Sequence, residues 1–328
     1  MSEFRTPIFP KRSENLINHQ SKVLLIGSCF TENIGNKMKN LSFDCFQNPF
    51  GIVYNPQSIC DQIIQLIYNI SIEEHELFFQ NEQWHNYHFH SRFSRTDKTE
   101  TQKAMNESMA EGHLFLKDAE YLIITLGTAK IYELNGTEGA VANCHKTPNS
   151  QFTQKMLSVE KIFELFNLTF CHLLKFNPSI KIIFTTSPIR HWKDGATENL
   201  LSKSTLNVAT YQIIDKYNQA EYFPAYEIMM DDLRDYRFYK DDMLHPSEQA
   251  IDYIWEKFCS TYMSEETLKL SEQIFNLINA KNHRPFNEKS EAHLKFKNQN
   301  YIRAKELKTH YPYLKIDVLI NYFSQLDN

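Results

Sequence analysis

The chain of 328 residues has few glycines, no paired cysteines and no long apolar run. Its 8 glycines and the lack of low-complexity segments argue against disordered linkers and favour a packed protein. No stretch approaches the roughly 20 consecutive apolar residues of a membrane span, so no transmembrane helix and no membrane partner are expected. The first residues, MSEFRTPIFPKRSENL, contain no apolar segment of the kind found in secretory signals.

Charge and cysteine content indicate which partners and which cellular compartment to expect. The formal net charge is −5 and no basic block occurs, which argues against nucleic acid as a partner. The six cysteines lack paired spacing, so in a chain without a signal we expect free thiols in a reducing, cytoplasmic compartment. No glycine-rich phosphate loop is present, and no cofactor is expected.

Short apolar runs alternate with helical patterns through most of the chain. Continuous apolar strands separated by helices indicate a parallel sheet that helices cover on both faces. We therefore expect an α/β fold, a flavodoxin-like three-layer α/β/α sandwich. The expected strands are 22–26, 42–47, 121–126, 181–186 and 220–225, and the expected helices are 31–39, 56–68, 158–176, 200–216 and 247–262.

Two segments depart from this alternation. Residues 73–95 are rich in Phe, Trp and Tyr around a turn-like Asn81-Glu82, which predicts an aromatic-rich insertion with a β-hairpin. Beyond residue 264 only helical patterns occur, at 265–280, 290–309 and 315–325. We therefore expect an α/β domain over 1–263 and a helical C-terminal extension over 264–328.

Three polar motifs follow expected strands, at the sheet edge where parallel α/β proteins bind ligands. Ser28 follows the first strand, Gly127-Thr128 follows the third, and Asp242-x-x-His245 follows the fifth. A serine hydroxyl needs a base to become a nucleophile, and histidine suits this role because its pKa lies near neutrality. An aspartate three residues earlier can fold back and hold the imidazole. The pattern predicts Ser28 as nucleophile, His245 as general base and Asp242 as its orienting partner.

The motifs around these residues carry a family resemblance. They are Gly27-Ser-Cys-Phe30, Asn48-Pro-Phe-Gly51, Asn143-Cys-His-Lys146, Ser187-Pro188 and Asp242-x-x-His245-Pro-Ser247. Over residues 20–260 the chain resembles the GSCFA family, a branch of the SGNH or GDSL-like hydrolases. The resemblance implies a serine esterase or acyl hydrolase that removes or transfers a small acyl group, such as acetyl, from a carbohydrate or similar alcohol. The reaction would pass through an acyl-enzyme on Ser28.

The resemblance also assigns an oxyanion hole. Gly51 matches the glycine whose N–H joins that of Ser28, and Gly127 matches the glycine of the third sequence block. The superfamily carries Asn two residues after that glycine, where this chain has Ala129. Asn143 is the candidate replacement, since its amide can donate the same hydrogen bond. Loss of one such donor costs about 2.7–4 kcal/mol in the barrier, so this replacement governs how active the site is.

Further residues near these motifs are candidates for the substrate pocket. His145 and Lys146 line the pocket or only satisfy a loop, and the sequence leaves both open. The expected partner is a small-molecule or glycan ester, and the sequence does not give the oligomeric state. The candidate pocket residues are Gly127, Thr128, His90, His145, Lys146 and Arg190.

Alternatives for the nucleophile and base stay open. Ser28 could merely cap the following helix, and His245 could be a buried structural residue. Cys29 could be the reactive atom instead of Ser28. Adjacent side chains at a strand end point to opposite sides, and we expect Cys29 to be the one that faces the core.

Two other functions also stay open. One is a catalytically weak binding protein that keeps the SGNH frame without the third-block Asn. The other is a metal-dependent hydrolase that uses His85, His88 and His90, since three histidines can hold zinc. No neighbouring Asp, Glu or Cys completes that ligand set, so no metal site is predicted.

Overall fold

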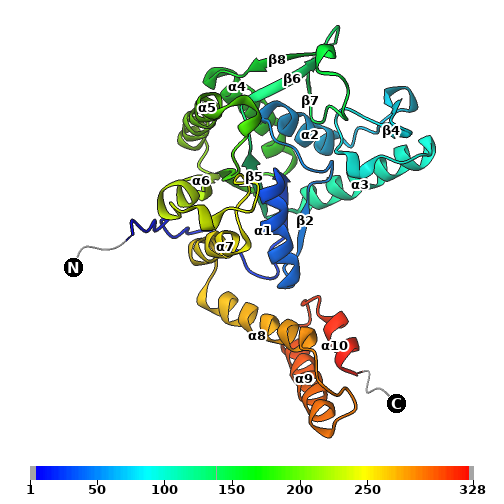
Figure 1. Cartoon of the computed structure of the whole chain (residues 1–328), viewed down its shortest axis with the longest axis vertical. Coiled ribbons are helices and arrows are strands. Elements are labelled where there is room, and N and C mark those ends of the chain that lie inside the picture. The colour runs from blue at the N-terminus through cyan, green and yellow to red at the C-terminus, as the bar shows by residue number, and fades with distance from the viewer. Residues whose placement is uncertain (1–4, 138, 325–328) are drawn as a thin grey trace. The chain divides into compact units, whose positions relative to one another are not determined.

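The computed structural model describes residues 5–137 and 139–324 (Figure 1). A sheet of five parallel strands has the order β10-β9-β5-β1-β2. When the five strands are numbered by their order in the sequence, the sheet runs 2-1-3-4-5 from the β2 edge, which is the flavodoxin-like order. The predicted α/β sandwich is therefore confirmed. The strands are β1 (Val23–Gly27), β2 (Cys45–Gln47), β5 (Tyr121–Leu126), β9 (Lys181–Thr186) and β10 (Ala220–Tyr222).

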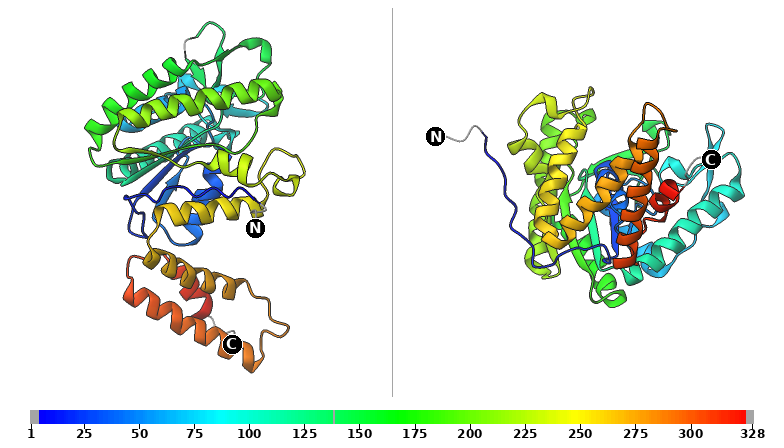
Figure 2. Two further views of the ribbon diagram at one scale, coloured as in Figure 1. Left: turned by 90° about the vertical axis from the view of Figure 1, so that its left-hand side faces the viewer. Right: turned by 90° about the horizontal axis from the view of Figure 1, so that it is seen from below.

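The central strands are apolar throughout because helices cover both faces of the sheet. Every residue of β1 and β5 is buried. Successive side chains alternate between the faces. Leu24, Leu122 and Ile182 point into one core. On the other face, the strands pack against α1 and α7 through Leu25, Ile123, Ile183, Phe30, Ile34 and Phe258. Figure 2 shows the sheet between its layers of helices.

The expected helices of this region are present with small shifts of their ends. They are α1 (Cys29–Asn40), α2 (Pro56–Tyr68), α4 (Val159–Phe176), α5 (Ala196–Lys216) and α7 (Glu248–Tyr262). The short helix α6 (Ala225–Glu227) runs into a π-helical turn over Ile228–Asp232. Across the described residues, none of the helices is both long and apolar enough to cross a bilayer.

Two features were not predicted. Helix α3 (Lys98–Asp118) packs against α2, and a second, antiparallel sheet has the order β7-β6-β8. Its strands are β6 (Lys130–Leu134), β7 (Ala140–Val141) and β8 (Phe152–Met156). Single 3-10 turns lie at Glu74–Glu76, Ser91–Phe93, Asn149–Gln151, Trp192–Asp194 and Tyr236–Phe238.

The hairpin predicted in the aromatic insertion is present. Strands β3 (Phe78–Gln80) and β4 (Gln83–His85) pair antiparallel across the two-residue turn Asn81-Glu82. Both turn residues have positive φ, 47° and 61°, as expected for a turn whose twist matches that of the paired strands.

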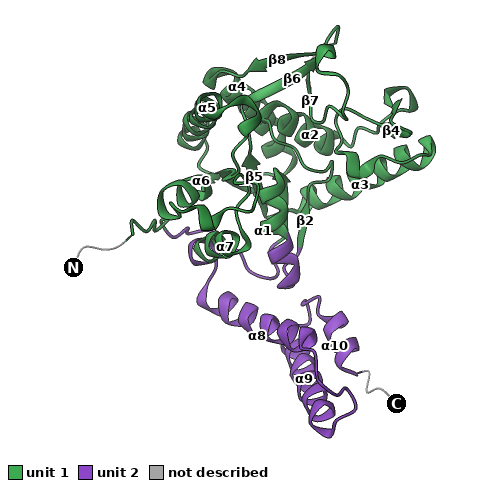
Figure 3. Ribbon diagram, viewed as in Figure 1, with its two compact units in different colours: residues 1–11, 22–35, 45–258 green, residues 12–21, 36–44, 259–328 purple. Residues whose placement is uncertain are grey.

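The chain forms two compact units, which Figure 3 shows in different colours. The first comprises residues 1–11, 22–35 and 45–258, and it contains the parallel sheet. The second comprises residues 12–21, 36–44 and 259–328. It therefore combines the helical tail with two segments from early in the chain. The boundary expected from the sequence, between residues 263 and 264, assigns only the tail to the second domain.

The second unit has an apolar core of its own. It is built on α8 (Glu265–Asn282), α9 (Glu291–His310) and α10 (Asp317–Ser324). Within this unit Ile17 pairs with Met263, and the N–H of Lys315 donates to Oγ of Ser42 at 2.7 Å. The buried core residues are Leu270, Ile274, Leu277, Ala304, Leu307, Leu314, Ile316, Leu319 and Phe323.

Candidate active site

The chain turns sharply where β1 ends and α1 begins. Gly27 has a φ of +148°, and a Cβ at this position would lie 2.4 Å from the carbonyl oxygen of Thr125. Its N–H donates to Oδ1 of Asn48 at 2.8 Å, which fixes the turn. Only glycine fits here without strain. The turn delivers Ser28 and Cys29 to the carboxyl edge of the sheet, where α1 starts.

Ser28 and Cys29 occupy opposite environments. Ser28 is 1% exposed, and its Oγ donates to Oγ of Ser187 at 3.1 Å and accepts from the N–H of Phe30 at 3.3 Å. Cys29 is partly exposed and lines a pocket. The expectation that Cys29 would be the buried member of the pair is therefore wrong. Strand alternation stops at Gly27, and α1 begins at Cys29 itself.

Asp242 and His245 form the pair that their spacing predicts. Oδ2 of Asp242 lies 2.6 Å from Nδ1 of His245, and Oδ1 accepts the N–H groups of Leu244 and His245, both at 2.9 Å. These backbone donors, together with the imidazole, lower the pKa of Asp242 to about 2. Both side chains are about half exposed, at 47% and 44%. The carboxylate thus holds the ring while Nε2 makes no hydrogen bond to any described residue.

One pocket joins the start of α1 to this pair. It has a volume of about 590 Å³, and both Cys29 and His245 line it. Four of the residues predicted from sequence contribute to the same lining, namely Thr128, Asn143, Lys146 and Arg190. The structure therefore brings together motifs that lie more than 200 positions apart in the sequence.

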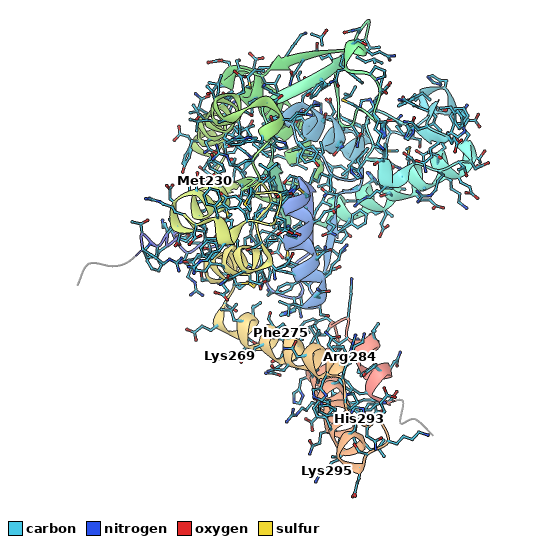
Figure 4. All side chains as sticks on the ribbon, in the orientation of Figure 1. Met230, Lys269, Phe275, Arg284, His293 and Lys295 are labelled. Atoms are coloured by element: carbon cyan, nitrogen blue, oxygen red, sulfur yellow. The ribbon has the colours of Figure 1, made fainter. Side chains whose placement is uncertain are left out.

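Arg190 links this pocket to a neighbouring hollow. Its guanidinium stacks over the ring of Trp192 at 5.2 Å, and Nη1 lies 3.9 Å from Sδ of Met230, which Figure 4 labels. Its Nε is buried without a hydrogen-bond partner among the described residues. The side chain is thus held by its stacking against Trp192.

Gly51 and His90 lie away from the pocket lining. The N–H of Gly51 donates to the carbonyl oxygen of Asn48 at 2.8 Å, so this N–H is already engaged in a turn. Gly51 has a φ of +85°, and a Cβ there would lie 2.2 Å from Cβ of His90. Nδ1 of His90 accepts the N–H of Arg92. In this structure the two residues shape the loop behind the pocket.

Asn143 lies in the pocket lining, whereas Ala129 does not. Ala129 is fully buried in the core, so the side chain at this position does not reach the pocket. Oδ1 of Asn143 accepts the N–H of His145 at 2.9 Å, and its Nδ2 has no partner among the described residues. The amide therefore presents a free donor within the pocket lining.

His85 of the insertion is held by hydrogen bonds and packs against His145. Nδ1 of His85 lies 2.7 Å from Oγ of Ser94, and Nε2 lies 2.9 Å from the carbonyl oxygen of Gln80. His145 is buried beside it, with ring centroids 4.5 Å apart, and burial lowers the pKa of His145 to about 4. Within residues 5–137 and 139–324, no group of three or more His, Cys, Asp or Glu residues is placed to hold a metal ion.

Two residues near the site gave little sequence signal. Lys203 in α5 is 1% exposed, its Nζ donates to the carbonyl oxygen of Ser187 at 2.7 Å, and burial lowers its pKa to about 7. His191 lines the pocket with its ring edge against Tyr54, and burial lowers its pKa to about 4. Nε2 of His191 is buried with no described hydrogen-bond partner. The position after a strand's carboxyl end marks His191 in the sequence as it marks Arg190, whereas nothing marks Lys203 among the polar residues of α5.

The family model described as the GSCFA family matches residues 22–258. The chain belongs to the GSCFA family. A further model, described as GSCFA domain protein, C-terminal domain, matches residues 274–328. The family predicted from the five motifs is thereby confirmed. No curated protein matches the sequence.

Distant similarity to solved structures exists as well. A carbohydrate esterase family 3 protein from Talaromyces cellulolyticus is 8% identical, with a TM-score of 0.37, over 78% of this chain and 99% of that one. An acetyl xylan esterase from the rumen bacterium Butyrivibrio proteoclasticus is 13% identical, with a TM-score of 0.37, over 81% of this chain and 66% of that one. Similarity at this level carries no argument about the site of the GSCFA protein, which is therefore interpreted from its own geometry.

Proposed function

We propose that this GSCFA protein hydrolyses or transfers a small acyl group, such as acetyl, from an ester of a carbohydrate or similar alcohol. One observation carries the proposal: the Asp242–His245 pair borders the same pocket as the first residue of α1. A base with an orienting carboxylate beside a nucleophile at a helix N-terminus is the arrangement that acyl transfer needs.

The geometry supports a specific division of labour. When Nδ1–H of His245 donates to Asp242, Nε2 is the acceptor that takes the proton of the nucleophile. The same proton passes to the departing alcohol, and water then releases the acyl group by the reverse sequence. In this proposal the oxyanion is stabilised by the N–H of Cys29 at the start of α1, which has no acceptor within the helix, and by Nδ2 of Asn143.

The pocket suits a small polar ester. Its volume of about 590 Å³ lies within the range of roughly 300–1,000 Å³ typical of small-molecule sites. Lys146 and Arg190 add positive charge to its rim, which would hold hydroxyl or carboxylate groups of the alcohol portion.

A panel of short-chain p-nitrophenyl esters and acetylated sugars tests the proposal. The wild-type protein should hydrolyse at least one of them, and His245→Ala should lower kcat/KM at least about 10³-fold because the base is lost. His283→Ala removes an exposed histidine from the second unit and serves as the matched control, with an unchanged rate.

Three outcomes separate the alternatives. Equal rates for wild type and His245→Ala would remove the acyl-transfer mechanism. Calorimetric binding of an acetylated sugar without turnover would favour the catalytically weak binding protein, a reading to which the engaged N–H of Gly51 lends some support. Loss of activity on addition of a chelator would favour a metal-dependent hydrolase.

A further inference from the structure

Two nucleophilic side chains stand next to each other at the start of α1, and their surroundings differ. The hydroxyl of Ser28 is buried and already donates to Ser187, whose own Oγ lies deep in the fold. The thiol of Cys29 borders the pocket that His245 also borders. A nucleophile has to reach both its base and an incoming carbonyl carbon. Cys29 meets the condition of access, and Ser28 does not.

The position of Cys29 at the start of α1 affects the pKa of its thiol. Cys29 is the first residue of α1, and its own N–H and that of Phe30, which also donates to Oγ of Ser28, favour the thiolate form of Cys29. Burial raises the pKa of the Cys29 thiol, while these two N–H groups and the charge of Lys203 oppose the rise. The resting thiol is therefore protonated at neutral pH and depends on a base to release it, which is the task open to Nε2 of His245.

The pocket beside Cys29 has further groups prepared for a ligand. Nε2 of His191 and Nε of Arg190 are buried without described hydrogen-bond partners, and both residues line the pocket. Buried polar atoms are costly when unpaired, so their presence at one surface indicates that a polar ligand completes them. Both residues line the same pocket as Cys29, and the buried Ser28 does not.

We infer that Sγ of Cys29 is the attacking atom of the proposed acyl transfer, and that Ser28 is a structural residue. The inference rests on the proposed function. Nε2 of His245 takes the thiol proton as Sγ bonds to the ester carbonyl carbon. The tetrahedral intermediate collapses with cleavage of the carbon–oxygen bond, and the alcohol leaves with the proton from His245. Water, deprotonated by His245, then attacks the thioester, which releases the carboxylic acid and restores the thiol.

Ser28 has a different role in this account. Its hydroxyl connects the end of β1 to Ser187 at the end of β9, and it caps the N–H of Phe30. It thereby fixes the direction in which α1 leaves the sheet and aims Cys29 at the pocket. Removal of this hydroxyl would loosen the site without removing the reacting atom.

Hydrolysis of p-nitrophenyl acetate by a set of variants tests the inference. Cys29→Ala should lower kcat/KM at least about 10³-fold, and Cys29→Ser should lose most activity, because a serine there is a weaker nucleophile with a protonated hydroxyl. Ser28→Ala should stay within about tenfold of wild type, since it removes one hydrogen-bonding hydroxyl. Cys171→Ala, which removes an exposed thiol from α4, is the control with an unchanged rate.

Alkylation of the wild-type protein gives a readout that does not depend on the folding of variants. Iodoacetamide should modify Cys29 and abolish activity in proportion, as followed by peptide mass spectrometry. His245→Ala should slow modification of Cys29 and leave that of Cys171 unchanged. A protein alkylated at Cys29 that keeps full activity would overturn the inference.

The outcomes distinguish this inference from the proposed function. Activity lost in Ser28→Ala but kept in Cys29→Ala would make Ser28 the nucleophile, so the inference would fail and the acyl transfer would stand. Full activity in both variants, or no hydrolysis of any ester by wild type, would remove the acyl-enzyme itself. Loss of activity in Cys29→Ala with activity kept in Ser28→Ala would support both the inference and the proposed function.

Discussion

Two histidine-containing regions of the first unit invite comparison, the pocket edge around His245 and the insertion around His85 and His145. His245 is about half exposed, one ring nitrogen is held by Asp242, and the other has no described partner. His85 has both nitrogens engaged by neighbours, and His145 is buried against it. His85 and His145 thus build structure, whereas His245 keeps one ring nitrogen open and is oriented through the other. A high number of histidines in one segment is therefore a weaker guide to a catalytic site than a single histidine with one ring nitrogen oriented and the other open.

The comparison depends most on the carboxylate that orients His245. Asp242→Asn should lower kcat/KM about a hundredfold, because the amide no longer favours the tautomer with Nε2 as acceptor. The effect is placed below the roughly 10⁴-fold loss known for a buried triad aspartate, since Asp242 is half exposed. The measurement is kcat/KM for ester hydrolysis by Asp242→Asn, with Asp241→Asn, which changes an exposed neighbouring aspartate, as the control. Equal rates for the two variants would mean that the carboxylate does not act through His245.

The opposite behaviour is expected for His145, which is buried against the insertion. His145→Ala should reduce the free energy of unfolding by about 2 kcal/mol, because it deletes a buried ring and its hydrogen bond to the carbonyl oxygen of Asn86. The rate per folded molecule should change little. Urea unfolding followed by kinetics on the folded fraction measures both. A large loss of kcat at unchanged stability would assign His145 to the chemistry.

A smaller effect concerns the lysine beneath the pocket. Burial holds the pKa of Lys203 at about 7, well below that of a lysine in the unfolded chain. Between those values the unfolded state binds a proton that the folded state has released, so the free energy of unfolding rises with pH. The slope contributed by one such group is at most about 1.4 kcal/mol per pH unit.

Lys203→Met is the variant that isolates this slope. Unfolding curves at pH 7 and pH 9 should show stability rising more steeply with pH in the wild-type protein than in the variant. Other groups titrate in both proteins and cancel in the difference. Parallel pH dependence in the two proteins would show that Lys203 stays charged in its buried position.

The sheet could be predicted from sequence because its strands are buried on both faces. Such strands are continuous apolar runs, and β5 and β9 begin and end where the runs YLIITL and KIIFTT do. Helix α3 was not predicted because its buried face is a single narrow line that includes polar and small residues. That line consists of Thr101, Met105, Met109, Gly112 and Leu116, and it lacks the apolar stripe by which a helix is recognised. In the antiparallel sheet, β6 is mostly half-buried and β8 mostly exposed, and neither strand is a continuous apolar run.

The site was predictable only where it is local in sequence. The Asp242–His245 contact follows from a three-residue spacing, and the edge to which Ser28 and Cys29 belong follows from the end of β1. Which of the two faces the pocket depends on the residue at which α1 starts, and the sequence does not fix a helix boundary that closely. Lys203 reaches the site from the side of a helix distant in sequence, so only the packing of α5 against the sheet reveals it.

The most direct measurement is a peptide map of protein quenched in acid during turnover of p-nitrophenyl acetate. The account predicts a single acetyl group on the peptide that contains Cys29, removed by neutral hydroxylamine as a thioester is, and absent when His245 is replaced by Ala. A fully active protein with no acetyl group on the segment from Gly27 to Phe30 would contradict the acyl-enzyme at the start of α1. An acetyl group on Ser28, resistant to neutral hydroxylamine, would contradict the assignment of the attack to Cys29.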